Sequence, residues 1–315
     1  MNPAMDAIPP ARAGRPRNAY VRALGRLAAA LLCVIVPFAL VAIPFNLFAV
    51  NPLIRKLGAV LLAGAVLGGY GAYVRVVEHR GARELGLTRA DVSLLLQGML
   101  LGSALLCSTL GLLWSVGAYE VIGHGSWHDP LLAIPGFLLG AVLEEVVIRG
   151  ILFRIAEQAV GTWIALVVSA VVFGALHLHN PGATWFSAIA IAMEAGVMLA
   201  AAFVLTRSLW FCIGIHFAWN YLQGGIFSIS VSGGAAKGWL TGRMTGSDWL
   251  TGGAFGVEAS LVAWAVCTLA GFGLLAAASA RRRTVAPHWR RAGAPLAGDD
   301  PRRDQAPSTF VPRRS

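Results

Sequence analysis

Long apolar stretches follow one another along most of the chain, and short polar or charged segments separate them. A helix needs about 20 apolar residues to cross a bilayer. The pattern predicts eight such spans, at about 27–50, 57–77, 92–118, 132–156, 162–178, 184–206, 208–223 and 256–279. The first span is too long for the core of a signal peptide, so we interpret it as a retained helix. We therefore expect an all-α, polytopic membrane protein with about eight transmembrane helices.

The composition agrees with a chain that folds in lipid. Hydrophobic residues make up 57% of it and charged residues 13%, whereas soluble domains have about 25% charged residues. The net charge of +10 lies entirely in the two ends, because five Arg face one Asp in 1–26 and nine Arg face three Asp in 281–315. We expect two basic, disordered tails there, which set the topology and contact lipid headgroups.

Basic segments next to membrane spans favour the cytoplasmic side. Both tails should therefore be cytoplasmic, which requires an even number of spans. The segment 119–130 has no Lys or Arg and should lie on the opposite side, and 224–254 is expected to be a long loop rich in Gly, Ser and Thr. The tails lack the interleaved aromatic residues of a nucleic-acid-binding module, so we expect no nucleic-acid partner.

Charged groups inside the fourth predicted span are the first candidates for function, because charge at membrane depth is costly and usually functional. Glu145 and Arg149 are four residues apart and can pair along one helix face. Glu144 lies about 100° around the helix from Glu145, since an α-helix has about 3.6 residues per turn. We predict that Arg149 holds one carboxylate as an anion and leaves the other free to act as a base. The alternative is a structural ion pair between helices.

Polar side chains in the fifth and seventh spans are the next candidates. His177 ends the fifth span, and His216 and Asn220 share a face of the seventh. Imidazole and amide donors on one face can stabilise an oxyanion. Each of these residues, taken alone, is equally compatible with packing or with a hydrogen bond between helices. Glu194 and Glu258 are also expected within apolar segments, and we interpret both as structural helix contacts.

These clusters, in this order, resemble the CPBP family of membrane proteins. That family contains the type II CAAX prenyl endopeptidases and the bacteriocin-processing and self-immunity proteins. Its signature is E-E-x-x-x-R, then F-x-x-x-H, then H-x-x-x-N on later helices. The resemblance covers about 132–260, and the usual aromatic residue before the motif Arg is Ile148 here. The residues that carry it are Glu144-Glu145 with Arg149-Gly150, Phe173-Gly174 with His177-Leu178, Leu209-Trp210, His216 with Asn220, Ser232-Gly233, and Thr251-Gly252-Gly253 followed by Glu258.

The resemblance implies a glutamate-dependent intramembrane endopeptidase without a cofactor. Its catalytic membrane domain would span 132–280, after N-terminal transmembrane helices at 27–131. Glu144 and His177 would activate water, while His216 and Asn220 would form the oxyanion site. Glu145 and Arg149 would orient and brace this assembly. The chain contains no nucleophile-elbow Ser, so we expect no acyl-enzyme.

Other functions stay open on the sequence alone. Two His and a carboxylate also make zinc sites, so a zinc-dependent membrane protease with the same residues as ligands is one alternative. A non-catalytic membrane scaffold or bacteriocin-immunity protein is another. A transporter that relays protons through Glu144 and Glu194 is disfavoured by the resemblance and by the lack of an internal repeat.

The expected partners are the lipid bilayer and a membrane-associated protein or peptide substrate. Arg outnumbers Lys by 23 to 2, which hints at a high-GC bacterial genome and hence at a bacterial plasma membrane. Bacteria generally lack prenylated CAAX proteins, so we expect a different substrate. The sequence carries no signal for the oligomeric state.

Overall fold

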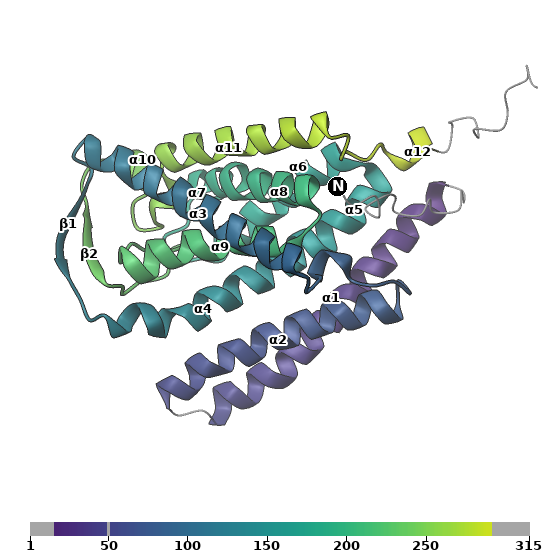
Figure 1. Cartoon of the computed structure of the whole chain (residues 1–315), viewed down its shortest axis with the longest axis horizontal. Coiled ribbons are helices and arrows are strands. Elements are labelled where there is room, and N and C mark those ends of the chain that lie inside the picture. The colour runs from purple at the N-terminus through teal and green to yellow at the C-terminus, as the bar shows by residue number, and fades with distance from the viewer. Residues whose placement is uncertain (1–15, 49–50, 292–315) are drawn as a thin grey trace, which may run out of the picture.

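The computed structural model describes residues 16–48 and 51–291. These residues form a bundle of helices with one small sheet (Figure 1), so the predicted all-α membrane fold is confirmed. The α-helices are α1 (Pro16–Phe48), α2 (Pro52–Val76), α3 (Arg89–Ser115), α4 (His128–Glu145), α5 (Arg154–Val160), α6 (Thr162–Leu176), α7 (Trp185–Ile191), α8 (Met198–Thr206), α9 (Leu209–Asn220), α10 (Asp248–Thr251), α11 (Leu261–Ala280) and α12 (His288–Arg291).

Shorter elements interrupt or join these helices. Three are π-helical, namely η3 (Val146–Phe153), η5 (Ala192–Val197) and η6 (Tyr221–Ile226). Three are 3₁₀-helical, namely η2 (Arg83–Leu85), η4 (His177–His179) and η7 (Val257–Ala259). The strands are β1 (Tyr119–His124) and β2 (Leu240–Met244).

Among the described residues, 7 helices are long and apolar enough to cross a membrane. They match seven of the eight predicted spans, with α4, η3 and α5 forming one helix, His128–Val160, and α7, η5 and α8 another, Trp185–Thr206. The predicted span 208–223 is helical, as α9 followed by η6, but it is not among the 7. Its polar residues His216, Asn220 and Gln223 lower its hydropathy.

The path of the chain requires an even number of crossings. Most helices run along the long axis of the molecule, and α1 begins at the same end at which α11 and α12 finish (Figure 1). The ring of Tyr20 in α1 lies 6.1 Å from that of His288 in α12. The number of crossings is even when α9 and η6 together form the eighth.

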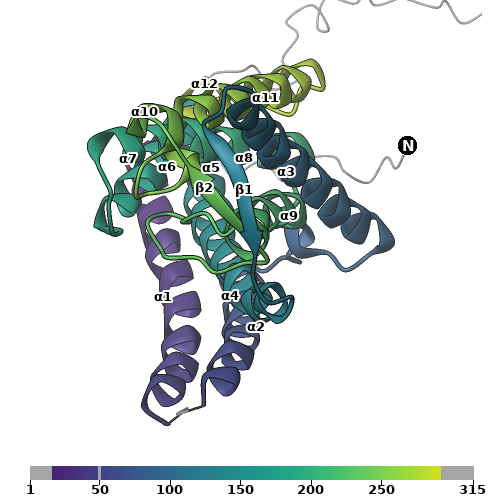
Figure 2. The ribbon, with the colours of Figure 1, turned by 90° about the vertical axis from the view of Figure 1, so that its left-hand side faces the viewer.

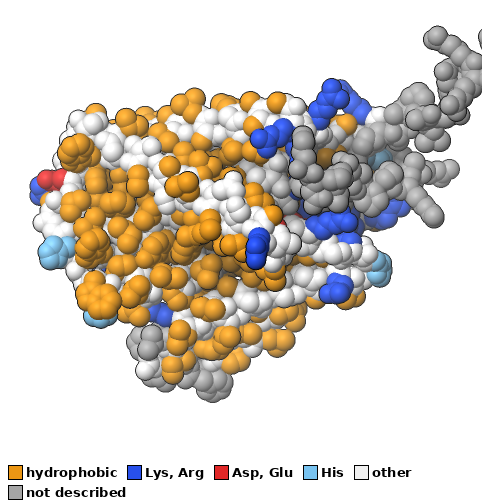
Figure 3. Space-filling view, viewed as in Figure 1, with side chains coloured by type: hydrophobic (Ala, Val, Ile, Leu, Met, Phe, Trp, Pro, Cys, Tyr) orange, Lys and Arg blue, Asp and Glu red, His pale blue; other side chains and the backbone are white. Residues whose placement is uncertain are grey.

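The surface has the distribution of side chains that a bilayer selects. Hydrophobic side chains cover most of the face in Figure 3, and Lys and Arg gather at the end that carries α12. Large exposed Trp side chains lie at the ends of the helices or in the outer loops, as is typical of membrane interfaces. They include Trp127, Trp185, Trp239 and Trp249 at the end with the sheet, and Trp163 and Trp289 at the other end.

The two predicted tails differ from expectation where the structure describes them. Residues 16–26 belong to α1 rather than to a disordered tail. Residues 281–291 pack against the bundle, because Thr162 and Val285 exchange hydrogen bonds of 3.0 and 2.8 Å and Arg207 donates to the carbonyl of Arg283 at 2.5 Å. The remaining parts of both predicted tails, 1–15 and 292–315, lie outside the described residues.

The predicted polar loops also contain structure. β1 lies within the segment 119–130 and pairs antiparallel with β2 from the segment 224–254, with a register shift between Val121 and Gly123. Figure 2 shows this two-stranded sheet crossing the end of the bundle. The strands are short and mostly exposed, so their pairing depends on the loops being brought together by the helices.

An ionic cluster at the basic end joins the α1–α2 hairpin to the rest of the bundle. Arg154 donates to both oxygens of Glu78 at 2.9 and 3.0 Å, and Arg26 of α1 also pairs with Glu78. Burial alone would raise the pKa of Glu78, but the hydrogen bonds and charges of Arg154 and Arg26 outweigh it and lower the pKa to about 2. Three separate segments are thereby held together at this end.

Glycines let α3 and α9 cross in direct backbone contact. A Cβ on Gly98 would lie 2.2 Å from the carbonyl oxygen of Phe211, and one on Gly102 would lie 2.3 Å from that of Ile215. Gly214 of α9 is equally close to the backbone of α3. Small residues four apart are a common means of close helix packing in membranes. The crossing places α9, and thus His216, deep in the bundle.

We predict that Gly102→Ala destabilises the protein while Gly111→Ala, on the same helix, does not. The added methyl at Gly102 must displace the backbone of α9, which costs about 1–3 kcal/mol in a well-packed core. A Cβ on Gly111 would meet no atom within 4 Å. Thermal unfolding in detergent measures the difference, and equal midpoints for the two variants would contradict the packing described here.

Candidate functional site

Three π-helical segments surround the predicted site residues. Glu144 and Glu145 come directly before η3, Glu194 lies within η5, and Asn220 comes directly before η6. A π-helical turn widens the helix and changes the direction in which side chains leave it, and such turns are frequent at functional sites. The local irregularity therefore coincides with the first and third sequence motifs and with Glu194, whereas the second motif ends in the 3₁₀-helical η4.

Glu145 and Arg149 form the predicted pair inside the protein. Arg149 Nη1 donates to Glu145 Oε1 at 2.8 Å, and both side chains are fully buried. The same oxygen accepts a hydrogen bond of 2.9 Å from His216 Nδ1. Because a carboxylate only accepts, His216 donates through Nδ1 and turns Nε2 away from Glu145. One carboxylate oxygen therefore orients residues from two motifs.

Arg149 also makes contacts beyond its own helix. Its Nη2 donates to the carbonyl oxygens of Ala195 at 2.9 Å and Gly196 at 3.4 Å, both in η5. Its guanidinium carbon lies 4.6 Å from the centre of the Phe173 ring. A planar guanidinium suits such combined hydrogen bonding and stacking. Arg149 thereby links the first motif to the helix with Glu194 and to the second motif.

Glu144 is the carboxylate that Arg149 leaves free. Its Oε2 lies 4.0 Å from His177 Nε2 and 3.8 Å from His216 Nε2. That oxygen is buried and has no hydrogen-bond partner among the described residues. The structure thus brings one residue from each of the three motifs to a common point, although the helices that carry them are far apart in sequence.

The orientation of His177 follows from its other nitrogen. Nδ1 lies 2.8 Å from the carbonyl oxygen of Phe173, which can only accept, so Nδ1 carries the proton. In the neutral ring Nε2 then has a lone pair directed toward Glu144. The rings of Phe173 and Phe255 pack against His177 at 4.7 and 6.5 Å. His177 is thereby held as an acceptor.

A cavity of about 290 Å³ opens beside Glu144 and His177. Its walls are mainly apolar, and most of the lining residues come from α4, η3 and α6. The apolar lining consists of Leu143, Val147, Ile148, Phe173 and Leu176, and Asn180 completes it. Val147 is half-buried, while Leu176 is exposed on the helix surface, so the cavity lies close to the lipid-facing side of the bundle.

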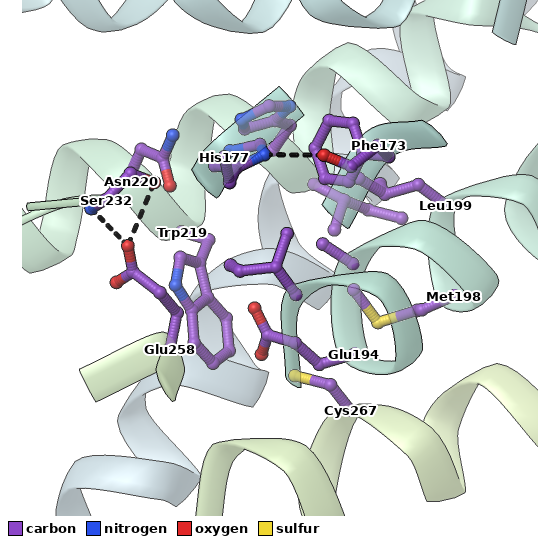
Figure 4. Close-up of a pocket in the computed structure, with 14 residues that line it drawn as sticks. Phe173, His177, Glu194, Met198, Leu199, Trp219, Asn220, Ser232, Glu258 and Cys267 are labelled. Atoms are coloured by element: carbon purple, nitrogen blue, oxygen red, sulfur yellow. Dashed lines mark hydrogen bonds between the residues drawn. The ribbon is translucent and has the colours of Figure 1, made fainter. Parts of the chain in front are cut away.

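A second, smaller cavity of about 30 Å³ lies on the other side of His177. Asn220 and His216 line it together with Trp219 and Ser232. Figure 4 shows Glu194 and Glu258 across this pocket from His177. The predicted oxyanion donors therefore face a cavity distinct from the one that contains Glu144, and both cavities meet at His177 and Phe173.

Glu258 has a more specific environment than a helix contact. It lies in η7 just before α11, is buried, and accepts hydrogen bonds from Gln223 Nε2 and from the backbone N–H and the hydroxyl of Ser232. Burial raises the pKa of Glu258 to about 7, although the bonds from Gln223 and Ser232 lower it in part. Gln223 was not among the predicted residues, yet it lies three positions after Asn220 and seven after His216, a spacing that indicates the same helix face.

Glu194 is also buried in this second cavity, where the thiol of Cys267 lies beside it (Figure 4). Its Oε2 has no hydrogen-bond partner among the described residues. Glu194 lies where η5 packs against α11, and its role as a structural helix contact stays a prediction.

The described residues contain no group of three His, Cys, Asp or Glu side chains that is placed to hold a metal ion. Glu144, His177 and His216 come nearest to such a set. Two donors on one tetrahedral zinc ion, with bonds of about 2.0–2.2 Å, lie about 3.3–3.6 Å apart. Glu144 Oε2 lies 4.0 Å from His177 Nε2 and 3.8 Å from His216 Nε2, which is slightly longer.

Comparison with known families bears on this site. The family model described as Type II CAAX prenyl endopeptidase Rce1-like matches residues 126–222. The match covers 97 of the 315 residues, and this segment is similar to that family. The matched segment includes all three motifs and ends two residues after Asn220, which confirms the predicted family resemblance. No curated protein and no solved structure matches the chain. The family is one of membrane proteases of the CAAX type.

We predict that Arg149→Met strongly destabilises the protein. The substitution leaves Glu145 buried without its cation, and the loss of one partner of a buried pair typically costs about 3–5 kcal/mol. Arg243→Met is the matched control, because its partner Glu120 is exposed on β1 and such pairs contribute about 0–1 kcal/mol. Thermal unfolding in detergent should separate the two variants, and similar midpoints would show that the buried pair is unimportant for stability.

Proposed function

We propose that the protein is an intramembrane endopeptidase that hydrolyses a peptide bond in a membrane-associated protein or peptide. In this proposal Glu144 and His177 activate the attacking water, and His216 and Asn220 stabilise the oxyanion. The observation that carries it is the convergence of Glu144 Oε2 on two histidine nitrogens, with that oxygen buried and without a hydrogen-bond partner in the described part of the chain.

The facing atoms of Glu144 and His177 account for water activation. Ionised Glu144 and the Nε2 of neutral His177 are both acceptors, and they lie 4.0 Å apart. Two acceptors at this separation do not bond to each other, but one water molecule can donate a hydrogen bond to each of them. Such a water has its lone pairs turned away from both acceptors and toward a substrate carbonyl carbon, as general-base catalysis requires.

The protons balance within this set of residues. When the water oxygen bonds to the carbonyl carbon, its proton passes to the Glu144–His177 pair. The same proton then goes to the leaving nitrogen as the C–N bond breaks. Charge that develops on the carbonyl oxygen meets the N–H of Asn220 and of protonated His216, whose Nδ1–H is bonded to the carboxylate of Glu145.

The lining of the larger cavity indicates the class of substrate. Leu143, Val147 and Leu176 surround the space next to Glu144, so we propose that the substrate places an apolar group there, close to the scissile bond. An apolar side chain of a membrane-inserted peptide fits this lining, and a prenyl group has the same character. Cleavage of matched peptides with and without the prenyl group would distinguish the two.

We predict that Glu144→Gln lowers kcat for cleavage of membrane-associated peptides by about 100-fold or more, the typical range for loss of a general base. The amide keeps the size of the side chain but cannot take the proton. Glu120→Gln, on the exposed face of β1, should leave cleavage unchanged. A quenched-fluorescence peptide panel in detergent or liposomes measures both variants.

The same panel decides between the proposal and its rivals. Cleavage that a strong chelator does not affect supports activation of water by Glu144 and His177. Loss of cleavage with chelator and its recovery with zinc would instead support the zinc-dependent alternative. A folded wild-type protein that cuts no peptide would favour a non-catalytic scaffold or immunity protein.

We further propose that the basic end of the bundle faces the cytoplasm of a bacterial cell, so that both termini are cytoplasmic. The gathering of Lys and Arg at that end supports this orientation (Figure 3). A green fluorescent protein fused to the C-terminus should therefore fluoresce in a bacterial host. Alkaline phosphatase inserted after Gly125, at the opposite end, should be active. The reverse pattern would show that the orientation is inverted.

A further inference from the structure

We propose that Glu258 is a positioning residue that holds Asn220 in place for the reaction, as Glu145 holds His216. This inference rests on the proposed function, because Asn220 has a role in the reaction only if it binds the oxyanion. The two predicted oxyanion donors would then each depend on a buried glutamate that does not itself touch the substrate.

The contacts of Glu258 tie two segments together. One is η6, where Gln223 donates its side-chain amide to Glu258 Oε2. The other is the loop after η6, where Ser232 donates both its backbone N–H and its hydroxyl, the latter at 3.0 Å, to Glu258 Oε1. Both carboxylate oxygens are thus engaged, and each segment is held by a different oxygen.

These contacts act on the junction that presents Asn220. Gln223 also accepts a hydrogen bond of 2.8 Å from Trp219 Nε1 and donates to the carbonyl of Ser230. Trp219 and Gln223 therefore flank Asn220 in sequence and are bonded to each other at the point where α9 changes into the π-helical η6. Because Glu258 holds Gln223, it limits how this junction can unwind or rotate.

The loop held by Glu258 borders the same cavity as Asn220. Ser232 lines that cavity, and its backbone is left-handed with φ of 49°. At Gly233 (φ +78°) a Cβ would lie 1.8 Å from the carbonyl oxygen of Pro181, so the loop rests directly on the segment that follows His177. The position of this loop is thus coupled to two motifs.

The surroundings of Glu258 explain why the hydrogen bonds must hold it. It forms no ion pair with a Lys, Arg or His side chain among the described residues. The titratable groups that line the same cavity are Glu194 from η5, Cys267 from α11, His177 from η4 and His216 from α9. None of them is hydrogen-bonded to Glu258, and His216 is instead bonded to Glu145. The hydrogen bonds from Gln223 and Ser232 therefore offset the cost of burying this carboxyl group. Losing either donor would restore part of that cost, so both segments are held in position next to Glu258.

The test compares three variants in the full-length protein. Glu258→Met removes all acceptors at similar size, Glu258→Gln keeps one oxygen, and Glu194→Met changes a second buried glutamate of the same cavity that does not bond to η6 or to the loop. Oxyanion contacts act in the transition state. Glu258→Met should therefore lower kcat by about 10-fold to 100-fold with little change in KM, as expected for a small misplacement of a reacting group.

The other variants and a measurement without substrate complete the test. Glu258→Gln should recover part of the lost kcat, and Glu194→Met should keep the wild-type kcat. Hydrogen–deuterium exchange of 228–234 should rise in Glu258→Met and stay unchanged in Glu194→Met. Unchanged exchange in Glu258→Met, unchanged kcat despite faster exchange, or equal losses of kcat in Glu258→Met and Glu194→Met would each overturn the inference. If wild type cuts no peptide, the proposed function fails and the catalytic role of Glu258 with it, while the exchange data still show whether Glu258 holds the loop.

Discussion

Inside the bundle, one oxygen of the Glu145 carboxylate accepts hydrogen bonds from both Arg149 and His216. All three side chains are buried, so water cannot offset the charge of Glu145 or of Arg149. The pair therefore has to be kept intact for the helices to pack, since an unpaired buried charge costs several kcal/mol. A contact required for stability thus also orients the ring of His216, with Nδ1 toward Glu145, and leaves Glu144 as the carboxylate that Arg149 does not pair with.

The site is built in layers around that contact. Arg149 extends it to the backbone of η5 and to the ring of Phe173, and Phe173 in turn accepts from His177. The close crossing of α3 and α9 at Gly102 holds the helix of His216 in register. Each π-helical turn lies where a polar side chain must leave its helix toward the centre. Helix packing, ion pairing and local helix geometry therefore act on the same few residues.

The sequence predicted the parts of this arrangement that depend on residues near one another along the chain. The apolar runs located the spans, and the four-residue spacing identified the pair of Glu145 with Arg149. The sequence did not predict contacts between helices, because the spacing of residues along the chain does not show which helices face each other. The bond of His216 to Glu145 and the network of Glu258 with Gln223 were therefore missed. The small sheet was missed as well, since its strands are short and lie in segments rich in Gly and polar residues. The resemblance to a known family supplied what local spacing lacked, namely that the three motifs meet.

The central claim is that Glu144 and His177 hold one water molecule between them. An experimental structure of the wild-type protein in lipid nanodiscs, at a resolution that shows ordered water, tests it most directly. The account predicts a single water within hydrogen-bonding distance of Glu144 Oε2 and His177 Nε2, with His177 Nδ1 bonded to the carbonyl of Phe173. A metal ion bound by Glu144, His177 and His216, or a direct hydrogen bond between Glu144 and His177 that leaves no room for water, would contradict it.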